Sequence, residues 1–170
     1  MLDELRKLQK ELQAEKMERF KRRVSFGDLI TDRSDNAREY GFGRGSTCYD
    51  NVLILGDVQV GEDTWIGPNV ILDGSGGLVI GSFCSISSGV QIYSHDTVRR
   101  STTLGKEPID FAATRIGNGV YIGPSCIIAK GVVIGDGATI GAMSFVNRDV
   151  AAGSKVWGCP AKVTGSAETG

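Results

Sequence analysis

The chain has 170 residues, which suits one domain with an appendage, and its formal net charge of −1 offers no positive field for nucleic acid. Twenty-four glycines beside only 7% aromatic residues favour a thin-cored fold with many corners. No apolar run is long enough to span a membrane and no signal peptide is recognisable, so we expect a cytoplasmic protein.

Residues 1–24 are predicted to form a helix. Leu5, Leu8 and Leu12 give one apolar stripe, and oppositely charged residues at i,i+4 spacing support the helix. Because an isolated helix of this kind is only marginally stable in water, we expect it to dock on its own domain or on a neighbouring subunit. The basic cluster at 21–23 leaves a second interpretation open, in which the helix lies on a membrane surface.

Residues 25–45 are polar and contain several glycines, so they are predicted to be a linker or an irregular cap. At the other end of the chain, residues 164–170 are small and polar and are predicted to be a flexible tail. These two segments enclose the repetitive part of the chain, residues 46–163.

A six-residue repeat organises residues 46–163. From Ile116 to Val146 a branched aliphatic residue recurs at every sixth position, and a small or β-branched residue follows each one four positions later. The earlier members are Ile54, Val60, Ile66, Leu72, Ile80, Ile86 and Ile92, with two extra residues before Ile80 that we expect to bulge outward at a corner. A period of six fits neither a helix nor a hairpin strand, but it fits a solenoid of short parallel strands with glycine-rich corners.

The repeat is interrupted between Ile92 and Ile116. The two residues are separated by a multiple of six positions, yet residues 93–114 contain no hexads, so we expect a long external loop after which the coil resumes in phase. Long loops in compact domains are usually functional. The root of this loop carries His95, the only histidine of the chain.

An imidazole can accept a proton from an attacking hydroxyl or amine near neutral pH, so His95 is the candidate general base. A general base needs a group that orients its other ring nitrogen. Asp96 is adjacent in sequence, and Asp110 or Glu107 could fold back from the loop. The sequence leaves open which of these carboxylates orients the ring.

The four cysteines are predicted to be free thiols. Cys84 and Cys126 fall on inward positions of the repeat, where a reduced thiol packs as a small apolar side chain. Cys159 has no histidine near it in sequence to activate it as a nucleophile. One histidine per chain cannot supply the three zinc ligands of a carbonic-anhydrase-type site, so no metal site is expected.

The hexads, the loop histidine and the Gly-x-Pro-Ala-Lys turn at 158–162 resemble the hexapeptide-repeat acyltransferases, in particular bacterial sugar O- and N-acetyltransferases. The resemblance covers residues 46–163 and implies an all-β solenoid, a left-handed parallel β-helix with three hexads per triangular coil, here preceded by an α-helix. It also implies acetyl-CoA-dependent transfer of an acyl group, with His95 as base, to a hydroxyl or amine of a sugar or nucleotide sugar, as in bacterial surface-polysaccharide biosynthesis.

In this family acetyl-CoA lies between the solenoids of two subunits, so the resemblance implies a homotrimer with shared sites. The positions that match its coenzyme A contacts are Tyr121, Gly123, Gly141, Ala142, Ser144, Arg148 and Lys162, each of which also has an ordinary structural interpretation. Relatives take an oxyanion donor from the residue after the aromatic-Ile-Gly corner. Here that residue is Pro124, which has no N–H, so Gly123 is the substitute candidate.

Two alternatives stay open. The chain could be a non-catalytic scaffold whose flat faces serve only assembly, or an acetyltransferase that acts on a small molecule other than a sugar. A scaffold has no need of a coenzyme A site, so binding of acetyl-CoA would distinguish it from an enzyme.

Overall fold

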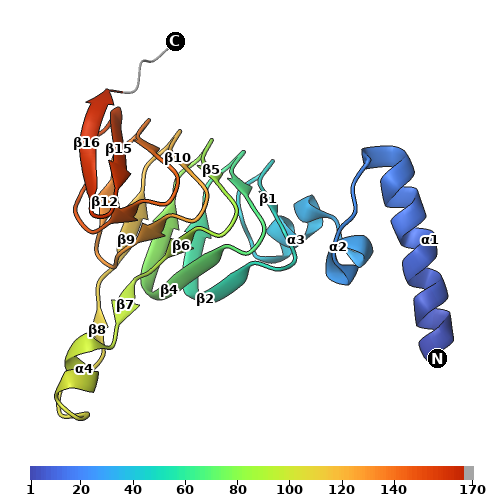
Figure 1. The fold of residues 1–170 in the computed structure, drawn as a ribbon, viewed down its shortest axis with the longest axis horizontal. Coiled ribbons are helices and arrows are strands. Elements are labelled where there is room, and N and C mark those ends of the chain that lie inside the picture. The colour runs from blue at the N-terminus through green and yellow to red at the C-terminus, as the bar shows by residue number, and fades with distance from the viewer. Residues whose placement is uncertain (167–170) are drawn as a thin grey trace.

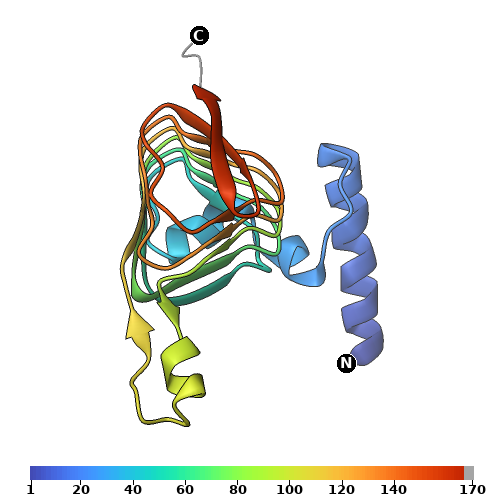
Figure 2. The ribbon, with the colours of Figure 1, turned by 60° about the vertical axis from the view of Figure 1, so that its left-hand side comes forward.

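The computed structural model describes residues 1–166, and most of them wind into a parallel β-solenoid with the shape of a triangular prism (Figures 1 and 2). Short strands stack on three faces, and each strand pairs in parallel with the equivalent strand one coil away. The predicted fold class, an all-β left-handed parallel β-helix with an N-terminal α-helix, is confirmed.

The first face consists of β1 (Thr47–Cys48), β3 (Trp65–Ile66), β5 (Ser85–Ile86), β10 (Tyr121–Ile122), β13 (Thr139–Ile140) and β15 (Ser154–Gly158), with β16 (Ala161–Ser166) added antiparallel at its end. The second face consists of the first halves of β2 (Leu53–Val60) and β4 (Ile71–Ile80), then β6 (Gln91–Ile92), β11 (Ile127–Ile128) and β14 (Phe145–Val146). The third face consists of the second halves of β2 and β4, then β9 (Thr114–Ile116) and β12 (Val133–Ile134).

The hexad aliphatic residues form the core. Ile122 pairs with Ile140, and Ile128 with Val146, so that each inward side chain stacks on the equivalent one in the next coil. These side chains are almost completely buried, as the six-residue period predicts. The corners between faces bring backbone against backbone: a Cβ on Gly81 would come within 2.7 Å of the Gly117 backbone. Glycine at such a corner is therefore a requirement of coil stacking.

The two extra residues before Ile80 form the expected irregularity at the corner after Leu72: Gly56 pairs with Gly74 and Val58 with Leu78, so residues 75–77 lie opposite the single residue Asp57. Strand β4 continues through it without a break, and Asp73 and Gly74 are buried, while only Ser75 is exposed. Asp73 lies just before the irregular residues, and its carboxylate points into the structure because it has hydrogen-bond donors there.

Residues 93–114 leave the prism as the predicted external segment, and the coil resumes in phase at β9. The segment has structure of its own: β7 (His95–Asp96) and β8 (Asp110–Phe111) form an antiparallel hairpin stem, and α4 (Val98–Thr102) lies near its tip. Figures 1 and 2 show this hairpin projecting from one corner of the prism.

The N-terminal region contains three helices. Helix α1 (Leu2–Phe20) ends at Lys21, whose φ of 54° is left-handed, so it is shorter than the predicted 1–24. The segment predicted as a linker or cap, 25–45, contains α2 (Phe26–Ile30) and α3 (Arg33–Glu39). Ala37 and Phe42 from this segment are buried against the first coil and close the open end of the core.

Helix α1 stands away from the prism and buries none of its residues within this chain (Figure 1). Its links to the rest of the chain are near its C-terminal end, where Gln13 Nε2 donates to the Arg22 carbonyl oxygen at 3.0 Å. In this structure, therefore, α1 does not dock on its own solenoid. Within residues 1–166, no helix combines the length and the apolar character that crossing a bilayer requires.

Strand β16 extends to Ser166 and pairs with β15, so residues 164–166 belong to the terminal hairpin and not to a tail. The remainder of the predicted tail, 167–170, lies outside the described residues.

The stacked core gives a testable difference between neighbours in β12. Ile134 is 1% exposed and points inward, whereas Val133 is 42% exposed and points outward. We expect Ile134→Ala to lower the free energy of unfolding by about 2–5 kcal/mol, because it leaves a cavity in the stack. Val133→Ala should cost about 1 kcal/mol or less, and equal losses for the two variants in urea unfolding would contradict this account of the core.

Candidate functional site

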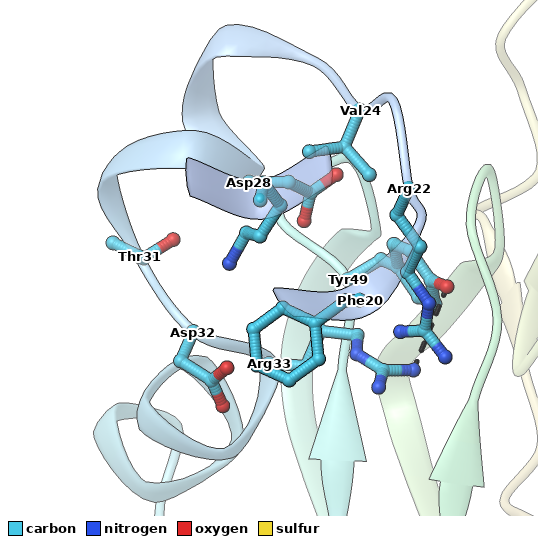
Figure 3. Close-up of a pocket in the computed structure, with 9 residues that line it drawn as sticks. Phe20, Arg22, Val24, Asp28, Thr31, Asp32, Arg33 and Tyr49 are labelled. Atoms are coloured by element: carbon cyan, nitrogen blue, oxygen red, sulfur yellow. Dashed lines mark hydrogen bonds between the residues drawn. The ribbon is translucent and has the colours of Figure 1, made fainter. Parts of the chain in front are cut away.

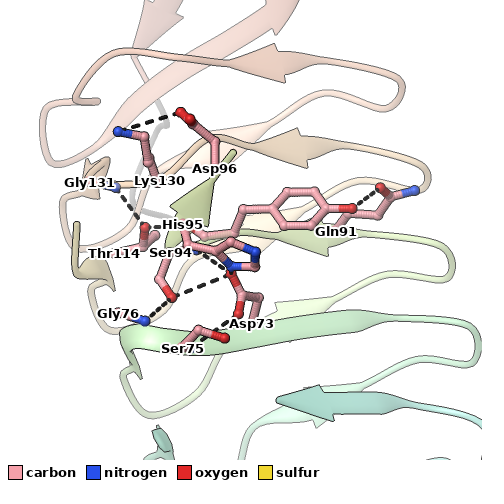
Figure 4. Close-up of polar contacts among 11 residues, drawn as sticks. Asp73, Ser75, Gly76, Gln91, Ser94, His95, Asp96, Thr114, Lys130 and Gly131 are labelled. Atoms are coloured by element: carbon pink, nitrogen blue, oxygen red, sulfur yellow. Dashed lines mark hydrogen bonds and ion pairs between the residues drawn. The ribbon is translucent and has the colours of Figure 1, made fainter. Parts of the chain in front are cut away.

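The candidate site lies at the corner between the second and third faces, where the chain leaves the coil after β6. Ser94 anchors this exit: its hydroxyl accepts a hydrogen bond from the Gly76 amide at 2.8 Å, and its own amide donates to Asp73 Oδ2 at 2.9 Å. His95 follows directly, at the start of the hairpin stem. The ring is therefore held at a corner that two successive coils build together (Figure 4).

His95 contacts a buried carboxylate. Asp73 Oδ2 lies 2.6 Å from His95 Nδ1, and the Asp73 side chain is fully buried while His95 is 28% exposed. Because an ionised carboxylate only accepts hydrogen bonds, this contact places the hydrogen on Nδ1 and leaves the lone pair on Nε2. The Phe111 ring packs beside the imidazole with centroids 5.9 Å apart. The arrangement can orient a proton acceptor at the surface.

Burial works to raise the pKa of Asp73, but hydrogen bonds from Ser75, the Ser94 amide and His95 outweigh it and hold that pKa at about 2. The Ser75 amide donates to Asp73 Oδ1 at 3.0 Å, so both carboxylate oxygens are occupied. Asp73 is therefore ionised at neutral pH, which is the state that stabilises a positive charge on the neighbouring imidazole.

The three carboxylates considered from sequence lie elsewhere. Asp96 points to the opposite side of β7 from His95, where it is 3.4 Å from Lys130 Nζ and accepts from the Val98 amide. Asp110 also pairs with Lys130, and Glu107 pairs with Arg99. Sequence neighbours in a strand face opposite sides, so adjacency to His95 was a misleading signal for Asp96.

Asp73 was not found by sequence reasoning as a site residue. One signal was available: it occupies the position after a hexad aliphatic residue, where several other hexads carry glycine, and it begins the irregular stretch before Ile80. The repeat itself gives no reason for a carboxylate there. Only the return of the chain by one full coil brings it to His95.

The predicted oxyanion donor is already used by the coil. The Gly123 amide donates to the Ile140 carbonyl oxygen at 2.9 Å, so it is not free to stabilise an oxyanion, and the assignment of Gly123 as donor is corrected. Its lack of a side chain has a packing reason, since a Cβ would lie 2.6 Å from the Ala142 nitrogen.

The corner at 141–144 carries three of the predicted coenzyme A contacts. The Gly141 amide donates to the Val156 carbonyl oxygen, and the buried Ser144 hydroxyl donates to the Gly141 carbonyl oxygen at 2.6 Å and accepts from the Gly158 amide at 3.0 Å. Both groups are thus used within the corner. The Ala142 amide donates no hydrogen bond to an acceptor within residues 1–166. Ala142 is exposed, so its amide is available as a donor for a ligand.

The remaining predicted contacts are exposed. Tyr121 lies on the outer side of the first face, between Ser85 and Thr139 of the adjacent coils. Arg148 follows β14, and Lys162 lies opposite Trp157 in the terminal hairpin. Their assignment to coenzyme A stays a prediction.

The structure brings Asp73 to His95 but does not bring either to the predicted coenzyme A corner. His95 lies where the second face ends, whereas Gly123 and Ala142 lie where it begins. One chain therefore carries the two halves of the candidate site at opposite edges of the same face.

A separate cavity lies at the junction of α1, α2 and α3, far along the chain from His95 (Figure 3). Phe20, Asp28, Arg33 and Tyr49 are among its lining residues, and Arg33 stacks over the Tyr49 ring at 5.1 Å. Its volume of about 40 Å³ holds no more than a few water molecules. This cavity is a packing feature of the cap.

The cysteines are free. Cys48, Cys84 and Cys126 are buried, and burial raises the pKa of each thiol, to about 12 for Cys48. Such thiols are poor nucleophiles at neutral pH. Among residues 1–166, no group of three or more histidine, cysteine, aspartate or glutamate side chains could hold a metal ion.

The sequence of residues 113–148 matches the family model described as bacterial transferase hexapeptide (six repeats). These are the coils in which the six-residue period is most regular. The match covers the coils from β9 to β14.

Curated relatives of this chain are named as acetyltransferases. The chloramphenicol acetyltransferase of Morganella morganii is 39% identical over 50% of this chain and 49% of its own length. The galactoside O-acetyltransferase of Escherichia coli is 32% identical over 66% of this chain and 47% of its own length, and the serine acetyltransferase of Buchnera aphidicola is 36% identical over 62% and 38%. The chain spans about half or less of the length of the curated relatives it matches.

Solved structures share the fold of this chain. A hexapeptide-repeat acetyltransferase of Vibrio cholerae, complexed with acetyl coenzyme A, superposes with a TM-score of 0.70 at 21% identity, over 98% of this chain and 88% of that one. AntD, an N-acyltransferase of Bacillus cereus in complex with dTDP and 3-hydroxybutyryl-CoA, gives 0.67 at 24% identity, over 75% and 72%. At these identities the likeness concerns the fold alone.

The low pKa of Asp73 predicts a pH dependence of stability. A group whose pKa falls from 3.8 to about 2 on folding stabilises the native state above pH 3.8, and this contribution is lost as the pH falls through about 2. We expect Asp73→Asn to be less stable than the natural chain by about 2 kcal/mol near neutral pH. The gap should narrow as unfolding is repeated at decreasing pH, whereas a gap that is independent of pH would contradict an ionised Asp73.

Proposed function

We propose that this chain transfers an acyl group from an acyl-coenzyme A to a hydroxyl or amine of a small acceptor, with His95 as general base. The observation that carries the proposal is the 2.6 Å contact between His95 Nδ1 and the buried Asp73 carboxylate. It leaves Nε2 as a proton acceptor on a partly exposed ring at the root of a projecting hairpin.

In the proposed reaction, His95 Nε2 takes the proton of the acceptor O–H or N–H as that atom attacks the thioester carbonyl carbon. The tetrahedral intermediate then collapses, the C–S bond breaks, and the imidazolium returns its proton to the leaving thiolate. Asp73 stays ionised throughout and stabilises the imidazolium, which makes it a positioning residue. The Ala142 amide is the candidate donor for the pantetheine arm or the oxyanion.

Acetyl-CoA is the proposed acyl donor. The curated relatives are named as acetyltransferases, and structural neighbours are complexed with acetyl coenzyme A or coenzyme A. No metal enters the proposal. The four free cysteines suit a reducing compartment, so a cytoplasmic location is part of it.

A sugar or nucleotide sugar is the first acceptor class to test. The galactoside O-acetyltransferase supports a sugar hydroxyl, and the dTDP bound to the N-acyltransferase AntD supports an acceptor with a nucleotide. Chloramphenicol and serine acetyltransferases among the relatives support the alternative of a non-sugar small molecule. An acceptor panel should therefore contain all of these classes, including nucleotide sugars of surface-polysaccharide synthesis.

We further propose a homotrimer with the active site between subunits. His95 and the Ala142 corner flank the second face, so rotation about a three-fold axis facing that face would bring the His95 edge of one subunit to the Ala142 edge of the next. The outward side chains of this face are mostly apolar, namely Leu53, Ile71, Ile127 and Phe145, with Gln91 as the polar exception. Such a face is better buried than left in water.

The base assignment predicts the behaviour of His95→Ala. We expect turnover to fall by about 10²–10⁴ while the thermal transition stays nearly unchanged, because the ring is partly exposed outside the core. Steady-state kinetics with acetyl-CoA and the acceptor panel measure the first quantity, and circular dichroism melts measure the second.

The scaffold alternative is tested in the same preparation. Acetyl-CoA should raise the melting temperature of the natural chain and of His95→Ala alike, since the base is not the main binding group. The absence of a shift at millimolar ligand would favour a scaffold, and full turnover in His95→Ala would place the base elsewhere.

The trimer predicts a mass of three times the 18.1 kDa chain in light scattering at micromolar concentration. Ile127 is 38% exposed on the second face and Val133 is 42% exposed on the third, which makes them a matched pair. We expect Ile127→Glu to dissociate the assembly and Val133→Glu to leave it intact, since only the former buries a charge at the interface. A natural chain that scatters as a monomer would contradict the proposal.

A further inference from the structure

Residues of two neighbouring coils contact the stem of the projecting hairpin, one coil on each side. On one side of β7, His95 meets Asp73 from the preceding coil. On the other side, Asp96 contacts Lys130, which comes from the following coil (Figure 4). Asp110, the cross-strand partner of Asp96, contacts the same ammonium. Lys130 Nζ is 2.5 Å from Asp110 Oδ2 and 3.4 Å from Asp96 Oδ2.

Lys130 separates two like charges. Asp96 and Asp110 are directly opposite each other in the antiparallel pair, an arrangement that destabilises a hairpin when both are ionised and nothing lies between them. The Lys130 side chain is only 20% exposed, and the hydrogen bond that it donates to Asp110 is the largest of the effects that raise its pKa. The ammonium is thus the cation that makes this stem compatible with two carboxylates.

The coil that carries Lys130 does not depend on it. Ile128 is buried in the core, and the Ala129 amide donates to the Val146 carbonyl oxygen at 2.9 Å. The distal part of the hairpin has its own ion pair between Arg99 and Glu107 at 3.4 Å. Removal of the ammonium would therefore act on the stem between these two regions, where His95 lies.

We propose that Lys130 is a positioning residue that fixes the hairpin stem between successive coils and so holds the His95 ring against Asp73. It acts through the β7–β8 backbone, since its contacts are to Asp96 and Asp110. The effect on catalysis rests on the proposed function, whereas the effect on the ring does not.

The test compares Lys130→Met, which keeps length and removes charge, with Lys130→Arg, which keeps the charge. Arg99→Met is the matched control, because it removes an ion pair from the same hairpin away from His95. We expect Lys130→Met to lower kcat by about 10- to 100-fold, as for other groups that orient a functional side chain, with the KM for acetyl-CoA changed by about twofold or less. Lys130→Arg should recover most of the loss, and Arg99→Met should stay within about twofold of the natural chain.

The single histidine provides a readout that needs no activity. In untagged protein labelled with ¹⁵N, the imidazole signals report the tautomer and the Asp73 contact of His95 alone. Lys130→Met should shift or broaden these signals, while Arg99→Met should leave them unchanged. If the natural chain binds no acetyl-CoA and turns over no acceptor, the proposed function fails, but the imidazole spectra still decide the role of Lys130.

Two results would overturn the inference: kcat in Lys130→Met within about twofold of the natural chain, or imidazole signals that superpose on those of the natural chain. Should Lys130→Met fail to fold, the double variant Asp96→Asn, Asp110→Asn removes both carboxylate charges that Lys130 binds, without leaving two like charges opposite each other. It should change the imidazole signals in the same sense, and unchanged signals in that variant would also overturn the inference.

Discussion

Stacking of one inward aliphatic residue on the next, coil after coil, is the constraint on which the rest of this protein depends. Each hexad contributes one such residue, and the parallel pairing of Ile122 with Ile140 or Ile128 with Val146 fixes the register between coils. Fixed register means that the corners also stack, with backbone so close that Gly81 and Gly123 have no room for a side chain. A corner residue in one coil therefore has a defined neighbour in the next.

The candidate site is a product of that register. Asp73, His95 and Lys130 come from three successive coils, and each contacts its partner across one coil spacing. The hairpin stem is inserted in the middle coil, so it has a coil on either side to which it can be tied. A long loop with such ties is held more firmly than its length suggests, which is what a positioned base requires.

Electrostatics decides the roles of the carboxylates. Asp73 is buried, yet the hydrogen bonds it receives keep it ionised, so the interior of the corner presents a fixed negative charge to the imidazole. Asp96 and Asp110 lie on the other side of β7, where their carboxylates pair with Lys130 and tie the hairpin stem to the following coil. The proposed acyl transfer needs both arrangements, and it also needs a second subunit, because the Ala142 corner lies across the second face from His95.

The sequence by itself determined the architecture: the period of six gave the coil, the inward residues, the corner glycines and the in-phase excursion at 93–114. It also pointed to His95 as the candidate base, because a lone histidine at the root of an interruption is a local signal. The sequence did not reveal Asp73 as the partner of His95, the prior use of the Gly123 amide, or the grouping of Lys130 with two aspartates. Those depend on which residues meet one coil apart, and only the tertiary structure decided them. The physical reason is that a repeat is a local pattern along the chain. A hydrogen bond between coils joins residues about one coil apart, and which residues these are follows only from how the coils stack.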